Sequence, residues 1–491
     1  MAIKSPILYE NPSATAFVID IPSSIAQAQA LPGQTPPASQ PHPASSTRGS
    51  YHGERVLLSS APLREPYPTL TEPKTEAARA RVLERIPLAE RQYHSEIIEP
   101  LVAEKLAELN GALENKFEWC LPRSLIENDA PDSPEDPAQG EQIQLMGKKR
   151  KRQRSTTTTC SFSCLNPESG SIHSNTLSNT RNDPPLILSP GENTFASISE
   201  LSNNLVKNTS IEPATVKICC QSMSTTEASN NDSTNYNYHS FYIPPSSHFL
   251  RCTIPISEPI HKSSSQLLLP DLPHDQKFNL ILLDPPWTNR SVRRSGHYQT
   301  QFYKGWDLLT ERICGVLRGY LQYDAFDNRE DGTSAVAKGP VAAIWITNSA
   351  KARKTAYEAI RGAGLEVCEE WVWCKVTMDG RPIVEVGGLW RKPYEVLVIG
   401  RVQSACGDGH GDGGIVRRVI AAVPDVHSRK PNLKELFERM FFSSGETAGC
   451  VPYAALEVFA RNLTAGWWAC GDDVLKFNSE EWWVDREDND M

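Results

Sequence analysis

The chain has 491 residues, more than one domain usually contains, so its length predicts one or two folded units with flexible sequence between them. Its 50 Lys and Arg against 59 Asp and Glu give a net charge of -9, which argues against a protein that coats nucleic acid through a basic surface. The absence of a signal-peptide pattern, of C-x-x-C pairs among the 12 cysteines and of any membrane-length apolar run predicts an intracellular protein without metal site or membrane contact.

The first part of the chain divides into two regions of different composition. Residues 1–73 are rich in Pro, Ala, Ser and Gln, which predicts a disordered N-terminal region because little apolar area is available to bury. In residues 74–128, apolar residues recur at helical spacing from Glu76 to Gly111, with breaks expected at Pro87 and Pro100. We interpret this part as a small helical module that packs on a catalytic domain, although it also has the features of a partner or substrate contact.

Residues 129–237 are rich in Ser, Thr and Asn and are predicted to form a disordered linker. The linker carries a basic cluster from Lys148 to Arg154. Such a run is typical of a nuclear-import address, and a nonspecific phosphate contact or a solvated charge run are the alternatives. We therefore expect binding to a nuclear import receptor and location in the nucleus, with the cytoplasm as a second location.

Residues 238–478 are predicted to form one α/β domain, and residues 479–491 an acidic C-terminal tail. The expected strands contain near-continuous apolar runs, which indicate a sheet buried on both faces. These strands are Phe278 to Leu283, Val341 to Thr347, Glu366 to Val376, Tyr394 to Gly400, Val416 to Val423 and Leu456 to Phe459. The expected helices are Asp307 to Gln322, Ala350 to Ala363 and Leu433 to Phe441.

The segment Asp284-Pro285-Pro286-Trp287 directly follows the first of these strands. Ligands of open α/β sheets bind beyond the carboxyl ends of strands, so these residues are candidates for a catalytic loop. The Asp284 carboxylate and the Pro285 carbonyl would accept hydrogen bonds from an aromatic amine such as that of adenine, and Trp287 would stack on the base. The structural alternative is a stiff turn with a core tryptophan.

A basic loop follows the tetrapeptide. Arg290, Arg293 and Arg294 are candidates for contacts with phosphates, and Tyr298 for stacking on a base or hydrogen bonding. Of this loop, Asn289, Arg293, Arg294 and Tyr298 are expected to bind substrate. The alternative is a solvated charged loop.

With this motif, the chain resembles the adenine methyltransferases related to the catalytic subunit of the mRNA adenosine methyltransferase. The Asn-Arg-Ser-Val-Arg-Arg-Ser continuation is similar to the branch called methyltransferase-like protein 4. The resemblance covers Phe278 to Phe477. It implies a Rossmann-like, S-adenosylmethionine-dependent methyltransferase domain with permuted motif order, in which the catalytic loop precedes the cofactor strand.

The resemblance also implies which residues bind the cofactor. The expected cofactor-binding residues are Asp284, Lys392, Lys430, Glu457, Phe459, Arg461 and Asn462, and Lys392 is also expected to contact substrate. The sequence departs from the family at Arg429, which occupies the place of a common histidine, with His427 two positions earlier. The departure leaves open whether Arg429 replaces that histidine.

Together these features predict transfer of a methyl group from S-adenosyl-L-methionine to the N6 amine of adenine in a nucleic acid. The resemblance favours RNA, with small nuclear RNA first, and DNA adenine is the alternative. A noncatalytic RNA-binding partner subunit with a methyltransferase fold is a second alternative, and an enzyme that acts on protein glutamine or on cytosine is a third. The target sequence, the need for a partner subunit and the oligomeric state are not defined by the sequence.

Overall fold

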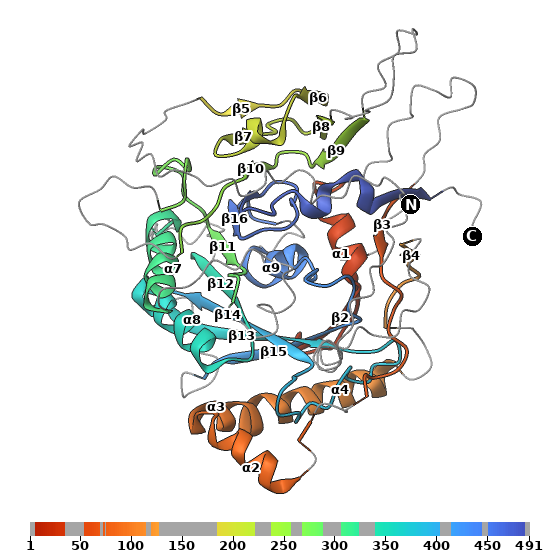
Figure 1. Cartoon of the computed structure of the whole chain (residues 1–491), viewed down its shortest axis with the longest axis vertical. Helices are drawn as coiled ribbons and strands as arrows, with labels where there is room; N and C mark the ends of the chain where they lie inside the picture. The colour runs from red at the N-terminus through yellow and green to blue at the C-terminus, as the bar shows by residue number, and fades with distance from the viewer. Residues whose placement is uncertain are drawn as a thin grey trace, which may run out of the picture.

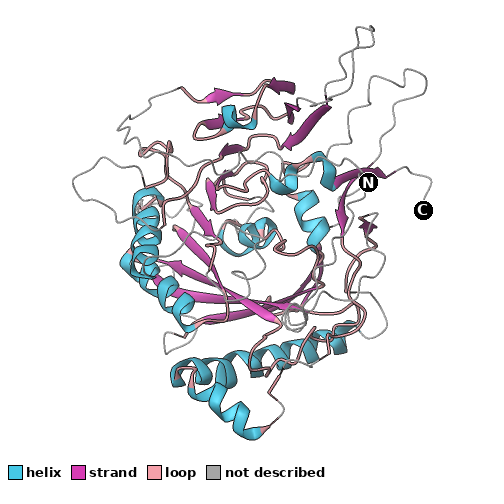
Figure 2. Cartoon of the chain, in the orientation of Figure 1, coloured by secondary structure: helices cyan, strands magenta, loops and turns pink. Residues whose placement is uncertain are grey.

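A computed structural model of the chain describes residues 5–34, 54–68, 72–73, 75–113, 119–126, 184–220, 237–256, 268–287, 306–323, 339–402, 414–443 and 450–486. A long, curved sheet crosses the molecule, with helices on both of its faces (Figures 1 and 2). The helical module lies below the sheet in this view, and a small sheet lies above it (Figure 1). No helix in the described ranges is long and apolar enough to span a membrane.

The described residues form a twelve-stranded mixed sheet. Its strands, in spatial order, are β1 (Ile7–Glu10), β2 (Ala16–Ile19), β15 (Val416–Ala422), β13 (Glu366–Lys375), β14 (Tyr394–Arg401), β12 (Val341–Ile346), β11 (Leu280–Leu283), β16 (Ala455–Val458), β17 (Trp468–Cys470), β10 (His248–Leu250), β7 (Leu205–Lys207) and β5 (Leu186–Ile187). The central strands β12, β11, β16, β17 and β10 run parallel, whereas β14 is antiparallel to both of its neighbours.

Alternate residues of the central strands enter two separate cores, because successive side chains of a strand point to opposite faces. Ile281 and Leu283 belong to the core that includes α7 (Trp306–Tyr320) and α8 (Ala350–Gly362). Leu280 and Leu282 belong to the other core, with α1 (Ile21–Gln27) and α9 (Lys434–Phe441). The prediction of a sheet buried on both faces, and of the six strands and three helices of the α/β domain, is confirmed.

The N-terminal region contradicts the prediction of disorder over residues 1–73. Residues 5–34 are folded, and β2 extends the sheet by pairing parallel to β15. The four residues of β2 are completely or almost completely buried. The average composition of this region conceals the apolar run Ala16–Ile19, which is stabilised by pairing with β1 and β15 and by contact with the helical module.

We expect Phe17→Ala to lower the free energy of unfolding by about 3–5 kcal/mol, since Phe17 is fully buried and its removal leaves a cavity. Urea denaturation measures this change. Ile211→Ala is the matched control, because Ile211 is 65% exposed and its loss should have little effect. Equal stability of the two variants would mean that the N-terminal strand is not part of the cooperative fold.

The helical module contains α2 (Glu76–Glu84), α3 (Leu88–Gln92), the π-helical turn η1 (Tyr93–Ile98) and α4 (Glu99–Leu113). The break at Pro87 is confirmed, whereas no break occurs at Pro100, because α4 continues directly from the π-helical turn η1 that precedes this proline. The module packs on the sheet through α4, which contacts β2 and β15. Buried ion pairs add to this packing, including one of 2.7 Å from Arg353 of α8 to Glu90.

The predicted linker and tail are also partly folded. Residues 184–220 contribute strands to the large sheet and to a small sheet of β6 (Gly191–Phe195), β8 (Ala214–Cys220) and β9 (Asn237–Ile243). In the tail, β18 (Trp483–Arg486) pairs with β3 (Glu54–Ser59), which is also bridged to β4 (Ser124–Leu125). Short 3-10 turns lie at η4 (Ile198–Leu201), η6 (Lys476–Asn478) and η7 (Glu480–Trp482). Polar composition concealed these strands because each is short and pairs with distant residues.

Candidate active site

The candidate site lies where β11 and β16 end next to each other. From β11 the chain continues to β12 on one side, whereas from β16 it continues to β17 on the other side. The strand connections therefore diverge between β11 and β16, and this divergence is the ligand-binding position of open α/β sheets. The Asp284 N–H donates to the Val458 carbonyl at 3.2 Å and thereby joins the two strand ends.

Asp284 is held by two basic side chains from the C-terminal part of the chain. Lys430 Nζ lies 3.0 Å from Oδ1 and 3.1 Å from Oδ2 of Asp284. Arg461 Nη1 lies 3.1 Å from Oδ2 and also donates to the Ser428 carbonyl at 3.2 Å. The sequence prediction placed these three residues in one site, and the structure brings them together from segments that are far apart in the chain.

Glu395 is a further member of this cluster that the sequence interpretation missed. Its Oε2 lies 3.2 Å from Lys430 Nζ, and its Oε1 accepts from Lys375 Nζ at 2.7 Å. Burial acts to raise the pKa of Glu395, but the positive charges of Lys375 and Lys430 outweigh it and lower this pKa. The available signal was the position of Glu395 at the start of an apolar strand, where a carboxylate would be costly without a cation.

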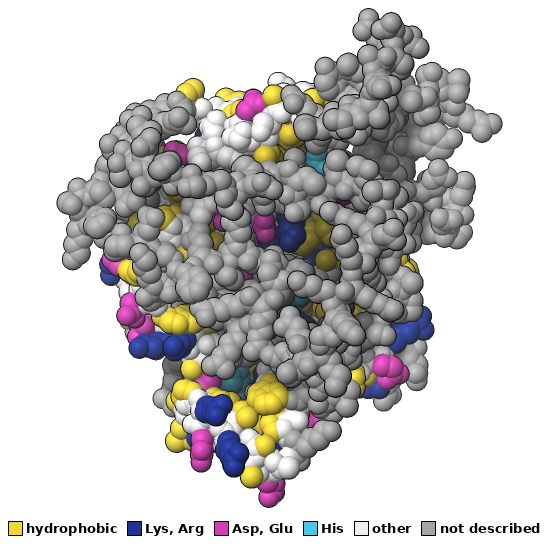
Figure 3. All heavy atoms as spheres, in the orientation of Figure 1, with side chains coloured by type: hydrophobic (Ala, Val, Ile, Leu, Met, Phe, Trp, Pro, Cys, Tyr) yellow, Lys and Arg dark blue, Asp and Glu magenta, His cyan; other side chains and the backbone are white. Residues whose placement is uncertain are grey.

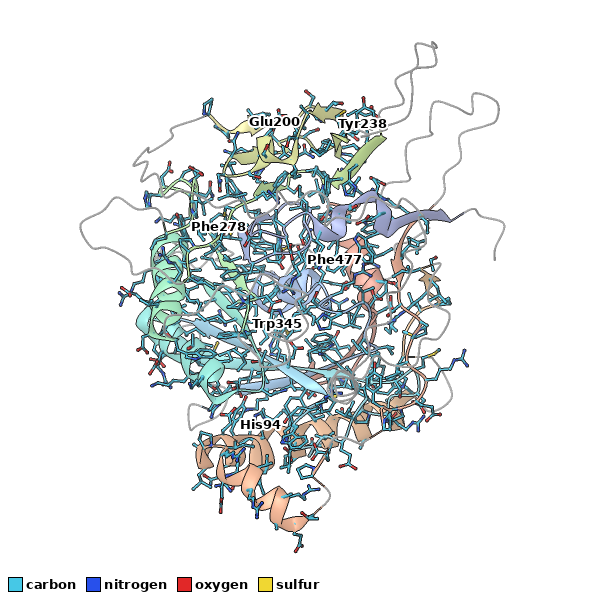
Figure 4. All side chains as sticks on the ribbon, viewed as in Figure 1. His94, Glu200, Tyr238, Phe278, Trp345 and Phe477 are labelled. Carbon is cyan, nitrogen blue, oxygen red and sulfur yellow. The ribbon has the colours of Figure 1, made fainter. Side chains whose placement is uncertain are left out.

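Lys430 stays charged in this site although it is largely removed from solvent. Burial acts to lower the pKa of Lys430, and the carboxylates of Asp284 and Glu395 reverse this effect and raise it. The ammonium also lies 5.4 Å from the centre of the Trp345 ring, which is near the middle of the molecule in Figure 4. Lys430 thus connects two carboxylates and an aromatic face at the ends of three strands.

Glu457 of β16 has a different electrostatic environment. Burial and the nearby negative charge of Asp284 raise the pKa of Glu457 to about 8, and Arg461 and Lys430 offset only part of this shift. Because the folded-state pKa exceeds that of the unfolded chain, the protonated side chain favours folding, and this contribution is lost as the pH rises through about 8. Ionisation of Glu457 is therefore unfavourable in the free protein, and a positively charged ligand next to it would favour ionisation.

We expect Glu457→Gln to become more stable than the wild type by roughly 1–3 kcal/mol as the pH rises from 6 to 9, in the absence of ligand. Thermal and urea unfolding over this pH range measure the difference in stability between the variant and the wild type. Titrations of other groups occur in both proteins and cancel in this difference. Glu366→Gln, at an exposed position of β13, is the control and should follow the wild-type profile. Parallel profiles for the wild type and Glu457→Gln would contradict the elevated pKa.

The end of β16 has an unusual backbone that shapes the site. Phe459 has a φ of 64°, a left-handed conformation that is rare for a residue with a side chain. Gly471 lies against this turn, since a Cβ at Gly471 would come 3.1 Å from the Phe459 Cα. Asn462 follows on the same loop, half-buried. The predicted residues Phe459, Arg461 and Asn462 thus line the turn that leaves β16.

The Pro285-Pro286 pair forms a tight turn, in which the Trp287 N–H donates to the Pro285 carbonyl at 2.8 Å. The Pro285 carbonyl therefore already accepts one hydrogen bond, and its second lone pair is the one that an adenine amine would use. Trp287 is only 6% exposed, and its indole N–H donates to the Trp345 carbonyl at 2.8 Å. One face of its ring stacks on Trp306 at 5.9 Å, so the stacking of a base on Trp287 stays a prediction for its other face.

Two predicted positions differ from the expected arrangement. Lys392 forms its ion pair with Glu99 of the helical module and not with the Asp284 cluster. Arg429 points to the opposite side of its loop, where it pairs with Asp425 at 2.6 Å and donates to the Leu58 carbonyl at 2.8 Å. Arg429 therefore stabilises the loop that carries Lys430 and does not take the place of a cofactor-binding histidine.

Several predicted residues lie outside the described residues. These are Asn289, Arg293, Arg294 and Tyr298 of the substrate loop and the basic cluster from Lys148 to Arg154. Their proposed contacts, and location in the nucleus, stay predictions. The described part of the chain contains no group of three or more His, Cys, Asp or Glu side chains that could hold a metal ion.

The fold and the site together define a Rossmann-like methyltransferase domain, in which the strand with Asp284 precedes the strand with Glu457 in the chain. Residues 278–473 match the family model MT-A70. This part of the chain is an MT-A70 domain, and the resemblance found in its motifs is confirmed.

Curated relatives agree with this assignment. The chain is 40% identical over 215 residues to the "N6-methyladenosine RNA methyltransferase MTA1" of Cryphonectria parasitica, a match that covers 42% of this chain and 55% of the relative. It is 29% identical over 252 residues to the human "N(6)-adenine-specific methyltransferase METTL4", covering 50% and 45%. It is 27% identical over 244 residues to a "DNA N6-methyl methyltransferase" of Caenorhabditis elegans, covering 49% and 54%. The matched part is thus about half of each relative.

Proposed function

We propose that the chain transfers a methyl group from S-adenosylmethionine to the N6 amine of adenine in a nucleic acid. The observation that carries the proposal is the position of the Asp284 carboxylate. It lies at the divergence point of the sheet and is held by Lys430 and Arg461 at 3.0–3.1 Å. The relatives' names refer to adenine N6 methylation and support the same reaction for this chain.

The residues of the site fit S-adenosylmethionine in charge and in hydrogen-bonding groups. The acidic side chains of Asp284 and Glu457 suit a positively charged ligand, and the pKa of Glu457, raised to about 8, indicates that a cation would be stabilised next to it. Glu457 and Asn462, at the end of β16, would accept hydrogen bonds from ribose hydroxyls. The cofactor would supply an electrophilic methyl group on a sulfonium.

Asp284 would orient the amine of the target adenine. A carboxylate offers about four lone-pair sites, and the contacts with Lys430 and Arg461 occupy three of them. The remaining site is on Oδ1, which Arg461 does not contact. An N–H of the adenine amine would donate to this oxygen, and the second lone pair of the Pro285 carbonyl would accept the other N–H. Positioning of the amine next to the methyl group would provide much of the acceleration of methyl transfer.

We favour RNA over DNA as the substrate, because the relative with 40% identity is named an RNA methyltransferase. The adenine must leave its stack to reach Asp284, which costs a few kcal/mol in a duplex and less in a single strand. A single-stranded or locally opened region is therefore the expected target. Basic and acidic side chains are interspersed on the exposed face of the helical module in Figure 3, so nucleic-acid contacts should be local.

The experiment that tests the function is incubation of the purified protein with S-adenosylmethionine labelled in its methyl group and separate pools of cellular RNA and DNA. Digestion and mass spectrometry identify the product. Labelled N6-methyladenine in RNA supports the proposal, and the same base in DNA alone would correct the substrate. Labelled glutamine or cytosine with unmodified adenine would refute it. Binding of the cofactor without any methyl transfer would indicate a noncatalytic subunit.

A further inference from the structure

The segment between β13 and β14 forms a rigid turn that is held by the N-terminal part of the chain. The backbone N–H groups of Leu389 and Trp390 donate to Oε1 of Glu72 at 2.9 and 3.2 Å. On the far side of Trp390, Lys392 forms an ion pair with Glu99 at the start of α4. Two carboxylates from another region therefore fix the backbone on both sides of Trp390.

The turn itself is tightly packed around Gly388. The Gly388 N–H donates to the Glu385 carbonyl at 3.1 Å. A Cβ at position 388 would lie 2.6 Å from the Arg391 carbonyl oxygen, closer than real Cβ contacts, and 3.1 Å from that of Glu385, which is also tight. The turn thus needs glycine at position 388, and its backbone is held by hydrogen bonds from within the chain.

Trp390 projects from this ordered turn into solvent. Trp390 is 55% exposed, whereas the other described tryptophans are buried or half-buried. Arg391 beside it is also exposed. An aromatic face and a guanidinium in adjacent positions suit a nucleic-acid strand, because bases stack on the ring and phosphates pair with the cation. The ordered backbone reduces the entropy lost when a base stacks.

The exposed ring lies on the connection that leads directly into the candidate active site. Four residues separate Trp390 from Glu395, so their Cα atoms lie at most about 18 Å apart. Glu395 contacts Lys430, which contacts Asp284. A strand whose adenine reaches Asp284 would therefore pass within reach of Trp390.

We propose that Trp390 stacks on a base that neighbours the target adenine and so helps to position the nucleic-acid strand. This inference rests on the proposed function, since it requires a nucleic-acid substrate at the Asp284 site. A second protein is the other occupant that an exposed tryptophan would suit. The adjacent arginine and the proximity to Asp284 favour the nucleic acid.

The test compares wild type and Trp390→Ala for binding of a uridine-rich single-stranded RNA with one central adenosine, in the presence of S-adenosylhomocysteine. Fluorescence anisotropy should show that Kd rises roughly 5- to 100-fold, because one base loses its stacking partner. KM for the RNA should rise similarly, while kcat at saturation and the affinity for S-adenosylhomocysteine are retained. Trp390→Phe should recover part of the affinity.

Abasic substitution locates the stacked base. At one position beside the adenosine, removal of the base should weaken binding to the wild type and have no further effect on Trp390→Ala. Tyr238→Ala is the matched control, because Tyr238 is 48% exposed on β9, at the opposite end of the molecule from the helical module in Figure 4. This control should bind RNA like the wild type.

Three results would overturn the inference. Unchanged RNA affinity in Trp390→Ala, with RNA methylation intact in the wild type, would exclude a role of Trp390 in RNA binding. The proposed function would not be affected. A change in oligomeric state of Trp390→Ala without a change in RNA affinity would assign the ring to a protein contact. A wild-type protein that neither binds nor methylates any RNA or DNA would overturn the proposed function together with this inference.

Discussion

Asp284→Asn should reduce methyl transfer to adenine by roughly 1,000-fold or more while the protein remains folded. The substitution keeps the shape of the side chain but replaces one acceptor oxygen with an NH2 group, which would face the N–H of the adenine amine. The loss should appear in kcat, because the interaction positions the reacting atom. Single-turnover assays with labelled S-adenosylmethionine and the RNA methylated by the wild type measure this effect.

The structure also predicts how the variant remains folded. Asp284 contributes to the raised pKa of Glu457, so its neutralisation should allow Glu457 to ionise more readily and to compensate Lys430 and Arg461. Binding of the neutral product S-adenosylhomocysteine should be retained, which calorimetry can verify. Asp379→Asn, in an exposed ion pair with Arg381, is the matched control and should be fully active. A variant that loses cooperative unfolding would show that Asp284 is a structural residue.

Lys430→Met should affect both activity and stability. Removal of the ammonium leaves the half-buried carboxylates of Asp284 and Glu395 without their shared cation. Breaking a fully buried ion pair costs about 3–5 kcal/mol, and the loss here should be smaller because Arg461 and Lys375 still contact these carboxylates. Turnover should fall by roughly 100-fold, since Asp284 loses the group that fixes its orientation. Urea denaturation and steady-state kinetics measure the two effects.

The pH dependence of unfolding distinguishes the loss of stability from the loss of activity in Lys430→Met. Without Lys430, the pKa of Glu395 should rise, so that acidification should restore part of the stability of Lys430→Met. Lys354→Met is the control for the loss of one positive charge, because the Lys354 side chain is 72% exposed. Lys430→Arg should recover stability more than activity, since its longer side chain keeps the charge but changes the position of Asp284. Full activity of Lys430→Met would exclude a role of this residue in the site.

The accuracy of the sequence predictions follows the range of the interactions involved. The strand Leu280–Leu283 and the tetrapeptide after it were predictable, because the apolar run and the two prolines constrain the backbone locally. The N-terminal strand β2 was missed, since its four buried residues are stabilised by β15, about 400 positions away. Lys392 was placed in the site because of its motif, yet its partner Glu99 comes from the helical module.

Sequence patterns were enough to predict the α/β class, the two strand ends that carry Asp284 and Glu457, and the resemblance to adenine methyltransferases. These depend on hydrophobic pattern and on neighbouring residues, which the chain order displays directly. The contacts themselves came from the tertiary structure: Glu395 joins the cluster through Lys430, Arg429 turns away to Asp425, and Trp390 stays exposed on its turn. The physical reason is that charge pairing and burial depend on which distant segments meet, and no local pattern encodes that meeting.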